Sequence, residues 1–95
     1  MQITTDFLIL GSGIAGLSFA LRAQAHGQVV VVTKRAAAEA ATSWAQGGIS
    51  AVLSPEDSFE KHVEDTMVAG AGLCHQVVVE ICAREAPEAV KWLAE

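Results

Sequence analysis

Two continuous apolar runs and a helical pattern between them dominate the first third of the chain. After Asp6, residues 7–10 are continuously apolar, and residues 29–33 are all β-branched. Neither run alternates with polar positions, as is typical of parallel strands covered on both faces. Between them runs a helical period with the apolar stripe Ile14, Leu17, Leu21 and Ala25. Gly27 is placed to close this helix. The pattern predicts a βαβ unit with a right-handed crossover.

The middle of the chain is less regular and then becomes helical. Residues 36–48 follow neither period, and residues 49–53 are compatible with a short strand. Residues 54–57 read Ser-Pro-Glu-Asp, a hydroxyl cap followed by proline and acids, which predicts a helix start. This helix is expected to end near Ala69, before the Gly-Ala-Gly of residues 70–72. Its expected buried residues are Phe59, Val63 and either Met67 or Thr66.

A last helix is predicted from about His75 to the end of the chain. It is expected to carry Val78, Ile81, Cys82 and Glu85 at helical spacing, and Pro87 is expected to kink or restart it. Cys74 and Cys82 are eight positions apart on this predicted helix, too far along the axis for a disulfide between them. We therefore expect reduced, half-buried thiols, as in a cytoplasmic protein.

Composition narrows the class of protein. The chain has 95 residues, of which 52% are hydrophobic, an apolar balance for so short a chain that predicts the N-terminal part of a larger domain. A net charge of −5 argues against nucleic acid or an anionic membrane as partner, and no apolar run is long enough to span a membrane. His62, Glu64 and Asp65 match no metal-binding motif, so no metal site is expected.

The residues between the first strand and the first helix carry the most informative motif. Residues 11–16 read Gly-Ser-Gly-Ile-Ala-Gly, which matches the G-x-G-x-x-G loop in its required strand-to-helix context. In such loops the first glycine permits the turn, the second admits a pyrophosphate and the third allows close helix–sheet packing. Free N–H groups at the helix start then receive phosphate oxygens. The motif predicts a dinucleotide site on a Rossmann-like α/β fold.

The end of the second strand lacks the acid that many dinucleotide-binding domains use for the ribose hydroxyls. Thr33, Lys34 and Arg35 stand there instead. Two cations favour the additional phosphate of NADP, whereas a solvated pair of surface cations is the alternative without a ligand.

Two downstream segments decide between these interpretations. The first segment follows the strand-ending Thr-Lys and is residues 45–49, Ala-Gln-Gly-Gly-Ile. The second is residues 62–74, His-Val-Glu-Asp-Thr-Met-Val-Ala-Gly-Ala-Gly-Leu-Cys. Both resemble the flavoprotein family of succinate dehydrogenase, fumarate reductase and L-aspartate oxidase. The second segment is more similar to the L-aspartate oxidase branch. The resemblance covers essentially the whole chain and implies a three-layer FAD-binding domain with a parallel sheet, of which residues 1–95 are the N-terminal part. It makes Lys34 part of an FAD site rather than a selector for NADP.

The resemblance assigns FAD contacts residue by residue. They fall on Gly11, Ser12, Gly13, Ile14, Ala15 and Gly16, on Lys34, and on Ala41, Thr42, Ser43, Trp44, Ala45, Gln46, Gly47 and Gly48. Family members that link FAD covalently carry a histidine where this chain has Ala41, so non-covalent FAD is expected. Trp44 either covers the cofactor or packs its loop onto the core.

The resemblance also implies an activity for the complete protein. That activity is the oxidation of L-aspartate to iminoaspartate with oxygen or fumarate as acceptor, in de novo NAD biosynthesis, with quinolinate synthase as a partner. The substrate-binding and catalytic residues are then expected beyond Glu95, and no residue of this chain is assigned a catalytic role. The alternatives are a soluble fumarate reductase or succinate dehydrogenase flavoprotein, and a non-enzymatic dinucleotide-binding fragment.

Overall fold

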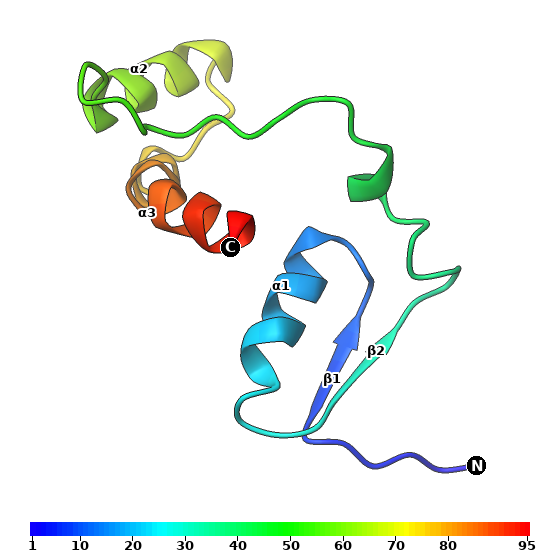
Figure 1. Cartoon of the computed structure of the whole chain (residues 1–95). Coiled ribbons are helices and arrows are strands. Elements are labelled where there is room, and N and C mark those ends of the chain that lie inside the picture. Colours follow the sequence, from blue (N-terminus) through cyan, green and yellow to red (C-terminus); the bar gives the residue numbers. More distant parts are fainter. The chain divides into compact units, whose positions relative to one another are not determined.

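The computed structural model describes residues 1–95, which form two compact units, Met1–Gly47 and Gly48–Glu95. The elements of the first unit are the strands β1 (Phe7–Leu10) and β2 (Val29–Val32), the helix α1 (Ile14–Ala23) and a short 3-10 helix, η1 (Ala41–Trp44) (Figure 1). The elements of the second unit are the helices α2 (Phe59–Ala69) and α3 (Gln76–Ala94). None of these helices combines the length and apolar character that a membrane span requires.

The predicted βαβ unit is confirmed. Strands β1 and β2 pair in parallel, with Phe7 opposite Val29 and Leu10 opposite Val32. The end of α1 differs from the prediction, because the helix stops at Ala23 and Gly27 does not cap it. Gly27 instead lies where a Cβ would stand 2.6 Å from the Asp6 carboxylate. That carboxylate accepts a hydrogen bond from the Gln28 N–H at 2.8 Å, so Gly27 allows the tight return into β2.

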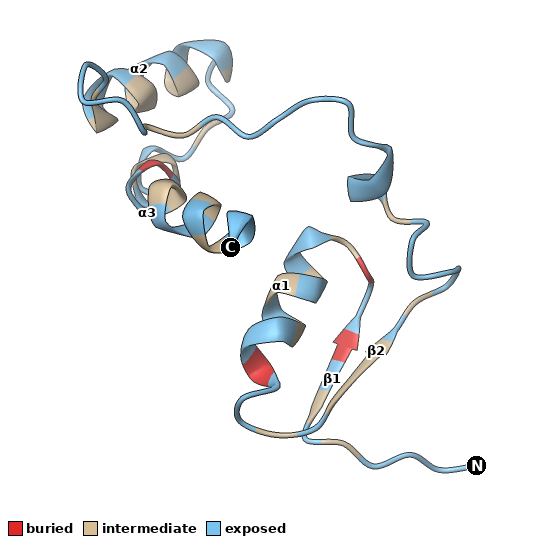
Figure 2. Ribbon diagram, in the orientation of Figure 1, coloured by how far each residue is buried: buried red, intermediate tan, exposed pale blue.

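Helix α1 packs on the strands through small residues rather than through the predicted apolar stripe. Ala23 is buried and Gly16 and Ala20 are half-buried, because small side chains let the helix backbone approach the sheet closely. The stripe residues Leu17 and Leu21 line an open hollow with Val29 and Val31 of β2, although they remain 43% and 57% exposed (Figure 2). Ala25 lies beyond the end of the helix, so the predicted stripe is only partly correct.

The strands are covered on one face only. Side chains alternate between the two faces of a strand. Ile9 is buried, whereas its neighbours Leu8 and Leu10 are 62% and 77% exposed. Phe7, on the same face as Ile9, meets Phe19 of α1 edge to face with the ring centroids 6.3 Å apart. The expectation that both faces are covered is therefore not met within this chain.

The first helix of the second unit begins later than the sequence pattern predicts. Helix α2 starts at Phe59, and Ser58 is its N-cap, accepting a hydrogen bond from the Lys61 N–H at 3.1 Å. Ser54 instead closes a turn of its own, in which its hydroxyl accepts from the Glu56 N–H at 3.2 Å. Both serines offer a cap, and the structure uses the second. Residues 49–53 form no strand, since no neighbouring segment pairs with them.

Helix α2 ends as predicted. Its half-buried face contains the expected Phe59, Val63, Thr66 and Met67. The chain leaves it with positive φ at Ala71 and Gly72, 49° and 90°. The Gly-Ala-Gly segment therefore ends this helix and turns the chain toward α3.

Helix α3 is one continuous helix that contains Pro87, so of the predicted kink or restart at this proline the restart does not occur. Its packing face is also displaced by one position from the prediction. Ala83 is 3% exposed, whereas the predicted stripe residues Val78 and Ile81 are 56% and 50% exposed (Figure 2). Alanine at this position lets α3 approach α2 closely, which larger aliphatic side chains would prevent.

The cysteine predictions require two corrections. Both cysteines are free thiols. Cys74 lies before α3 rather than on it, with its thiol directed to the Thr66 carbonyl oxygen at 3.6 Å. Cys82 is exposed rather than half-buried, and it lines an open hollow with His62 and Thr66 of α2.

Candidate functional site

The turn from β1 into α1 has the backbone geometry that a phosphate-binding loop requires. Gly11 adopts φ of +104°, a conformation that residues with a side chain rarely occupy. Its N–H donates to the Val32 carbonyl oxygen at 2.8 Å, which fixes the loop to the end of the parallel pair. Ser12, the next residue, is 7% exposed.

The first turn of α1 is left open for an anion. Its N-cap, Gly13, supplies no side-chain hydrogen bond, and the turn contains no acidic residue. A Cβ on Gly13 would meet only the Thr42 hydroxyl oxygen, at 3.7 Å. The Ile14 N–H of this turn donates to the Thr42 hydroxyl oxygen at 3.1 Å. The other N–H groups of the turn have no partner within the helix, and with the positive end of the helix dipole they suit an anionic ligand.

Gly16 determines how closely α1 approaches the strand. A Cβ there would overlap the Gly11 carbonyl oxygen and stand 3.3 Å from Ile9 Cγ2. The glycine therefore maintains the close packing that holds the loop in place, and Ala15 lies beside it in the same first turn.

A cavity of about 560 Å³ opens at the carboxyl ends of β1 and β2. Its lining comes from the strand ends and the two segments that follow them: Leu10, Gly11, Ser12, Gly13, Val32, Thr33, Lys34, Arg35, Glu39, Ala40 and Ala41. Ligands of open α/β sheets bind outside the carboxyl ends of the strands. The cavity thus brings the glycine loop together with Lys34 and Ala41, which the sequence predicted from separate segments.

The chain turns sharply as it leaves β2. The Thr33 hydroxyl donates to the Arg35 carbonyl oxygen at 2.9 Å and accepts from the Arg35 N–H at 3.3 Å. This local turn places Lys34 and Arg35 on the cavity wall, where two positive charges favour an anionic ligand.

Sequence reasoning missed Glu39 and Ala40 as lining residues. Glu39 is positioned by a turn in which its N–H donates to the Ala36 carbonyl oxygen at 2.8 Å. The available signal was a single acid in an alanine-rich segment, shortly after a strand that lacks the usual acid at its end. A carboxylate in this cavity can accept hydrogen bonds from hydroxyl groups of a ligand.

The η1 segment lies against the glycine loop. The Ile14 N–H of α1 donates to the Thr42 hydroxyl oxygen at 3.1 Å. Ser43 follows in η1, and Trp44, at its end, is 78% exposed, so Trp44 does not pack this segment onto the core. The remaining predicted site residues, Ala45, Gln46, Gly47 and Gly48, are exposed, and a Cβ on either glycine would meet nothing within 4 Å.

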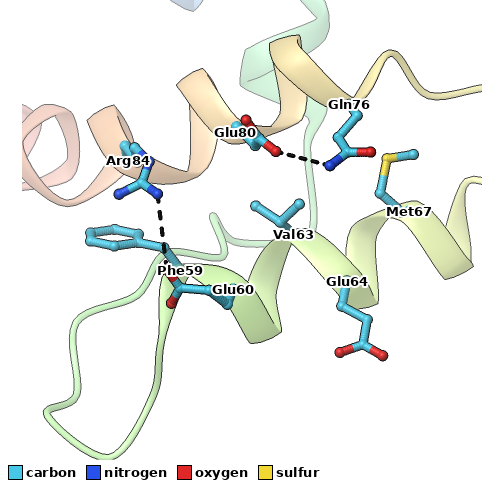
Figure 3. A pocket seen from close by; sticks show the side chains of 8 residues that line it. All are labelled: Phe59, Glu60, Val63, Glu64, Met67, Gln76, Glu80 and Arg84. Atoms are coloured by element: carbon cyan, nitrogen blue, oxygen red, sulfur yellow. Dashed lines mark hydrogen bonds and ion pairs between the residues drawn. The ribbon is translucent and has the colours of Figure 1, made fainter.

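A second hollow, of about 460 Å³, lies along α2 and α3 in the second unit. Figure 3 shows Val63 and Met67 pointing toward α3, while Glu64 points away. At its rim the Gln76 amide donates to the Glu80 carboxylate at 3.0 Å. This hollow is a helix-packing seam.

Arg84 closes one end of this seam. Its guanidinium lies 5.5 Å from the centroid of the Phe59 ring and 3.9 Å from the Glu60 carboxylate (Figure 3). Both contacts are made within the unit, so they contribute to helix packing.

Comparison with known sequences gives matches over nearly the whole chain. The model of the FAD binding domain family matches residues 6–95. L-aspartate oxidase of Vibrio cholerae is 49% identical over 90 residues, which are 95% of this chain and 17% of that protein. The chloroplastic L-aspartate oxidase of Oryza sativa subsp. japonica is 50% identical over 88 residues, 93% of this chain and 14% of that protein.

A solved structure has the same fold over nearly the whole chain. It is the FrdA chain of an E. coli quinol fumarate reductase mutant, with a TM-score of 0.88 and 36% sequence identity. The match covers 99% of this chain and 17% of that one. The chain therefore spans between 14% and 17% of the length of the proteins compared here.

Proposed function

The chain belongs to the FAD binding domain family, and we propose that it holds the dinucleotide FAD at the carboxyl ends of β1 and β2. The residues present fit such a group. Gly11 has the positive φ of the turn, Gly13 leaves space beside the helix start, and the adjoining cavity is open and lined by cations.

The contacts divide by chemistry. The pyrophosphate would be held at Ser12, Gly13 and Ala15, where the dipole of α1 is positive. Lys34 would add a charge-assisted contact from the cavity wall. The remaining contacts of the proposed site come from Gly11, Ile14 and Gly16 of the glycine loop and from Ala41, Thr42, Ser43, Trp44, Ala45, Gln46, Gly47 and Gly48.

We propose that FAD is held non-covalently. Ala41 lines the cavity at the position where covalent members of the family carry a histidine, and a methyl group offers no nucleophile to the flavin. Precipitating the protein with acid should release all of its flavin into the supernatant. Flavin that remained with the precipitated protein would refute this part of the proposal.

For the whole protein we propose the oxidation of L-aspartate to iminoaspartate, with oxygen or fumarate as acceptor, as a step of NAD biosynthesis in the cytoplasm. The observation that carries it is the identity of about half of all aligned residues with L-aspartate oxidases across 95% of the chain. FAD supplies the two-electron acceptor of such a reaction. The residues of this chain bind and orient it, and substrate-binding and catalytic residues are proposed to lie outside residues 1–95, in capping and C-terminal regions. Quinolinate synthase would use the product.

A fumarate reductase is the second candidate, because the FrdA chain shares the fold with a TM-score of 0.88. Its lower sequence identity, 36%, and Ala41 in place of histidine favour the oxidase. Anaerobic titration of the protein at its natural length separates the two. L-aspartate should bleach the flavin absorption and succinate should leave it unchanged, and the opposite pattern would overturn the assignment.

A non-enzymatic dinucleotide-binding fragment is the third candidate. Equilibrium dialysis of residues 1–95 with FAD tests it. We expect weak binding, because only one face of the sheet is covered in this chain. Submicromolar affinity would show that the segment is a binding module by itself.

A further inference from the structure

One hydrogen bond joins the two segments that the proposed FAD site combines. The Ile14 N–H, in the first turn of α1, donates to the Thr42 hydroxyl oxygen at 3.1 Å, across 28 positions of sequence. Both residues are in the first unit. A Cβ on Gly13 would lie 3.7 Å from the same oxygen, so the Thr42 hydroxyl stands directly beside the glycine loop.

The chemistry of this bond constrains what else Thr42 can do. A hydroxyl has one proton to donate, and in the bond to Ile14 it acts as acceptor. Its own proton is therefore left for a ligand atom that accepts. The Ile14 N–H is at the positive end of α1, so the bond further polarises the hydroxyl toward donation. The Thr42 hydroxyl is therefore better suited to donate a hydrogen bond to a phosphate oxygen than to accept one from an N–H or O–H group of the ligand.

The bond also removes Ile14 from the set of free donors. An N–H in the first turn of a helix has no partner within the helix and would otherwise be available to phosphate. Here the Thr42 hydroxyl occupies it, so the pyrophosphate must be received by the neighbouring N–H groups and by Thr42 itself. Ser43 contributes no comparable link, since its bond within this segment is from its backbone N–H to the Ala40 carbonyl oxygen at 3.0 Å.

We propose that Thr42 is a positioning residue that latches η1 and the residues after it to the glycine loop before FAD arrives. This inference rests on the proposed function of the site. The latch reduces the freedom that the exposed segment 41–48 would lose on binding, and such preorganisation raises affinity beyond what the contact of the Thr42 hydroxyl with the ligand contributes. The latch also couples the position of η1, which follows β2, to the first turn of α1.

The test uses the protein at its natural length, stripped of FAD, with Thr42→Val and Thr42→Ser. Valine keeps the shape and removes the oxygen, whereas serine keeps the oxygen and removes the methyl group. FAD binding is measured by quenching of its fluorescence, and the visible circular dichroism of the bound flavin reports its geometry. Amide hydrogen exchange of the peptide containing Ile14 measures the latch in the apoprotein. Thr66→Val is the matched control, because the Thr66 hydroxyl donates within its own helix, to the His62 carbonyl oxygen at 2.7 Å.

Thr42→Val should weaken FAD binding about tenfold, the loss expected for a hydrogen bond near the upper end of the usual range. It should also speed exchange at Ile14 and change the flavin dichroism. Thr42→Ser should restore all three, and Thr66→Val should match the wild type in FAD affinity. Wild-type affinity and exchange in Thr42→Val would overturn the latch, as would an equal loss in Thr42→Ser, which would assign the effect to the methyl group. Wild-type protein that binds no FAD would refute the proposed function itself.

Discussion

Replacing Gly16 by alanine tests the close approach between α1 and the end of β1. The added methyl group would overlap the carbonyl oxygen of Gly11 and stand 3.3 Å from Ile9 Cγ2. The first neighbour is backbone, so it cannot rotate away as a side chain would. Either α1 must move from the strand or the peptide of Gly11 must move.

The magnitude follows from two opposing effects. Overpacking of this kind costs about 1–3 kcal/mol, and a backbone neighbour places it at the upper end. Alanine in place of glycine within a helix recovers about 1 kcal/mol. The free energy of unfolding should therefore fall by about 2 kcal/mol, the difference between these two values. Movement of Gly11 also shifts the phosphate loop, so FAD affinity should fall by about tenfold or more, as even about 1.4 kcal/mol of lost binding energy implies.

Chemical denaturation of the apoprotein at its natural length, followed by circular dichroism, measures the first effect, and fluorescence titration with FAD measures the second. Gly48→Ala is the control for stability of the apoprotein, because a Cβ at Gly48 meets nothing within 4 Å. If Gly16→Ala unfolds at the same denaturant concentration as Gly48→Ala and keeps wild-type FAD affinity, the close approach is not what holds the loop.

Three further substitutions separate binding from stability. Gly13→Ala should reduce FAD affinity in a fluorescence titration while leaving the unfolding free energy within about 0.5 kcal/mol, because the added Cβ meets only the Thr42 hydroxyl, at 3.7 Å; a large loss of stability would contradict this. Lys34→Ala should weaken FAD about tenfold, as expected for a charge-assisted contact, and the loss should shrink at high salt; an effect independent of salt would argue against a phosphate contact. Ser58→Ala should cost about 1 kcal/mol of stability through loss of the α2 cap, with FAD affinity unchanged, and a shift in affinity would show that the second unit affects the site.

Much of the candidate site was predictable from local sequence. The glycine loop joins an apolar run to a helical period. Gly11, Gly13 and Gly16 match the three glycines of G-x-G-x-x-G, the pattern of a strand that turns directly into a helix beside a bound pyrophosphate. The positive φ of Gly11 and the crowding at Gly16 have the predicted geometry. The two specific segments, residues 45–49 and 62–74, identified the family that the matching FAD binding domain model shows.

The faces and ends of the helices were less predictable, because they depend on which neighbour each helix meets. A period of apolar residues shows that a helix has a packing face, but Ala20 and Ala23 of α1 pack closely where Leu17 and Leu21 do not. Likewise, Ser54 and Ser58 are both residues that can cap a helix. In the structure Ser58 caps α2, whereas Ser54 closes a separate turn before it.

The sequence by itself therefore determined the βαβ unit, the turn geometry of the glycine loop and the family, since each is encoded in residues that are neighbours along the chain. Only the tertiary structure decided that Thr42 meets Ile14 and that Glu39 joins Lys34 on the wall of one cavity. Thr42 and Ile14 come from segments that follow different strands, and Lys34 and Glu39 lie five positions apart in the segment after β2, which has no regular period. Their contact depends on where the parallel pairing of β1 and β2 brings the strand ends, which no local pattern specifies.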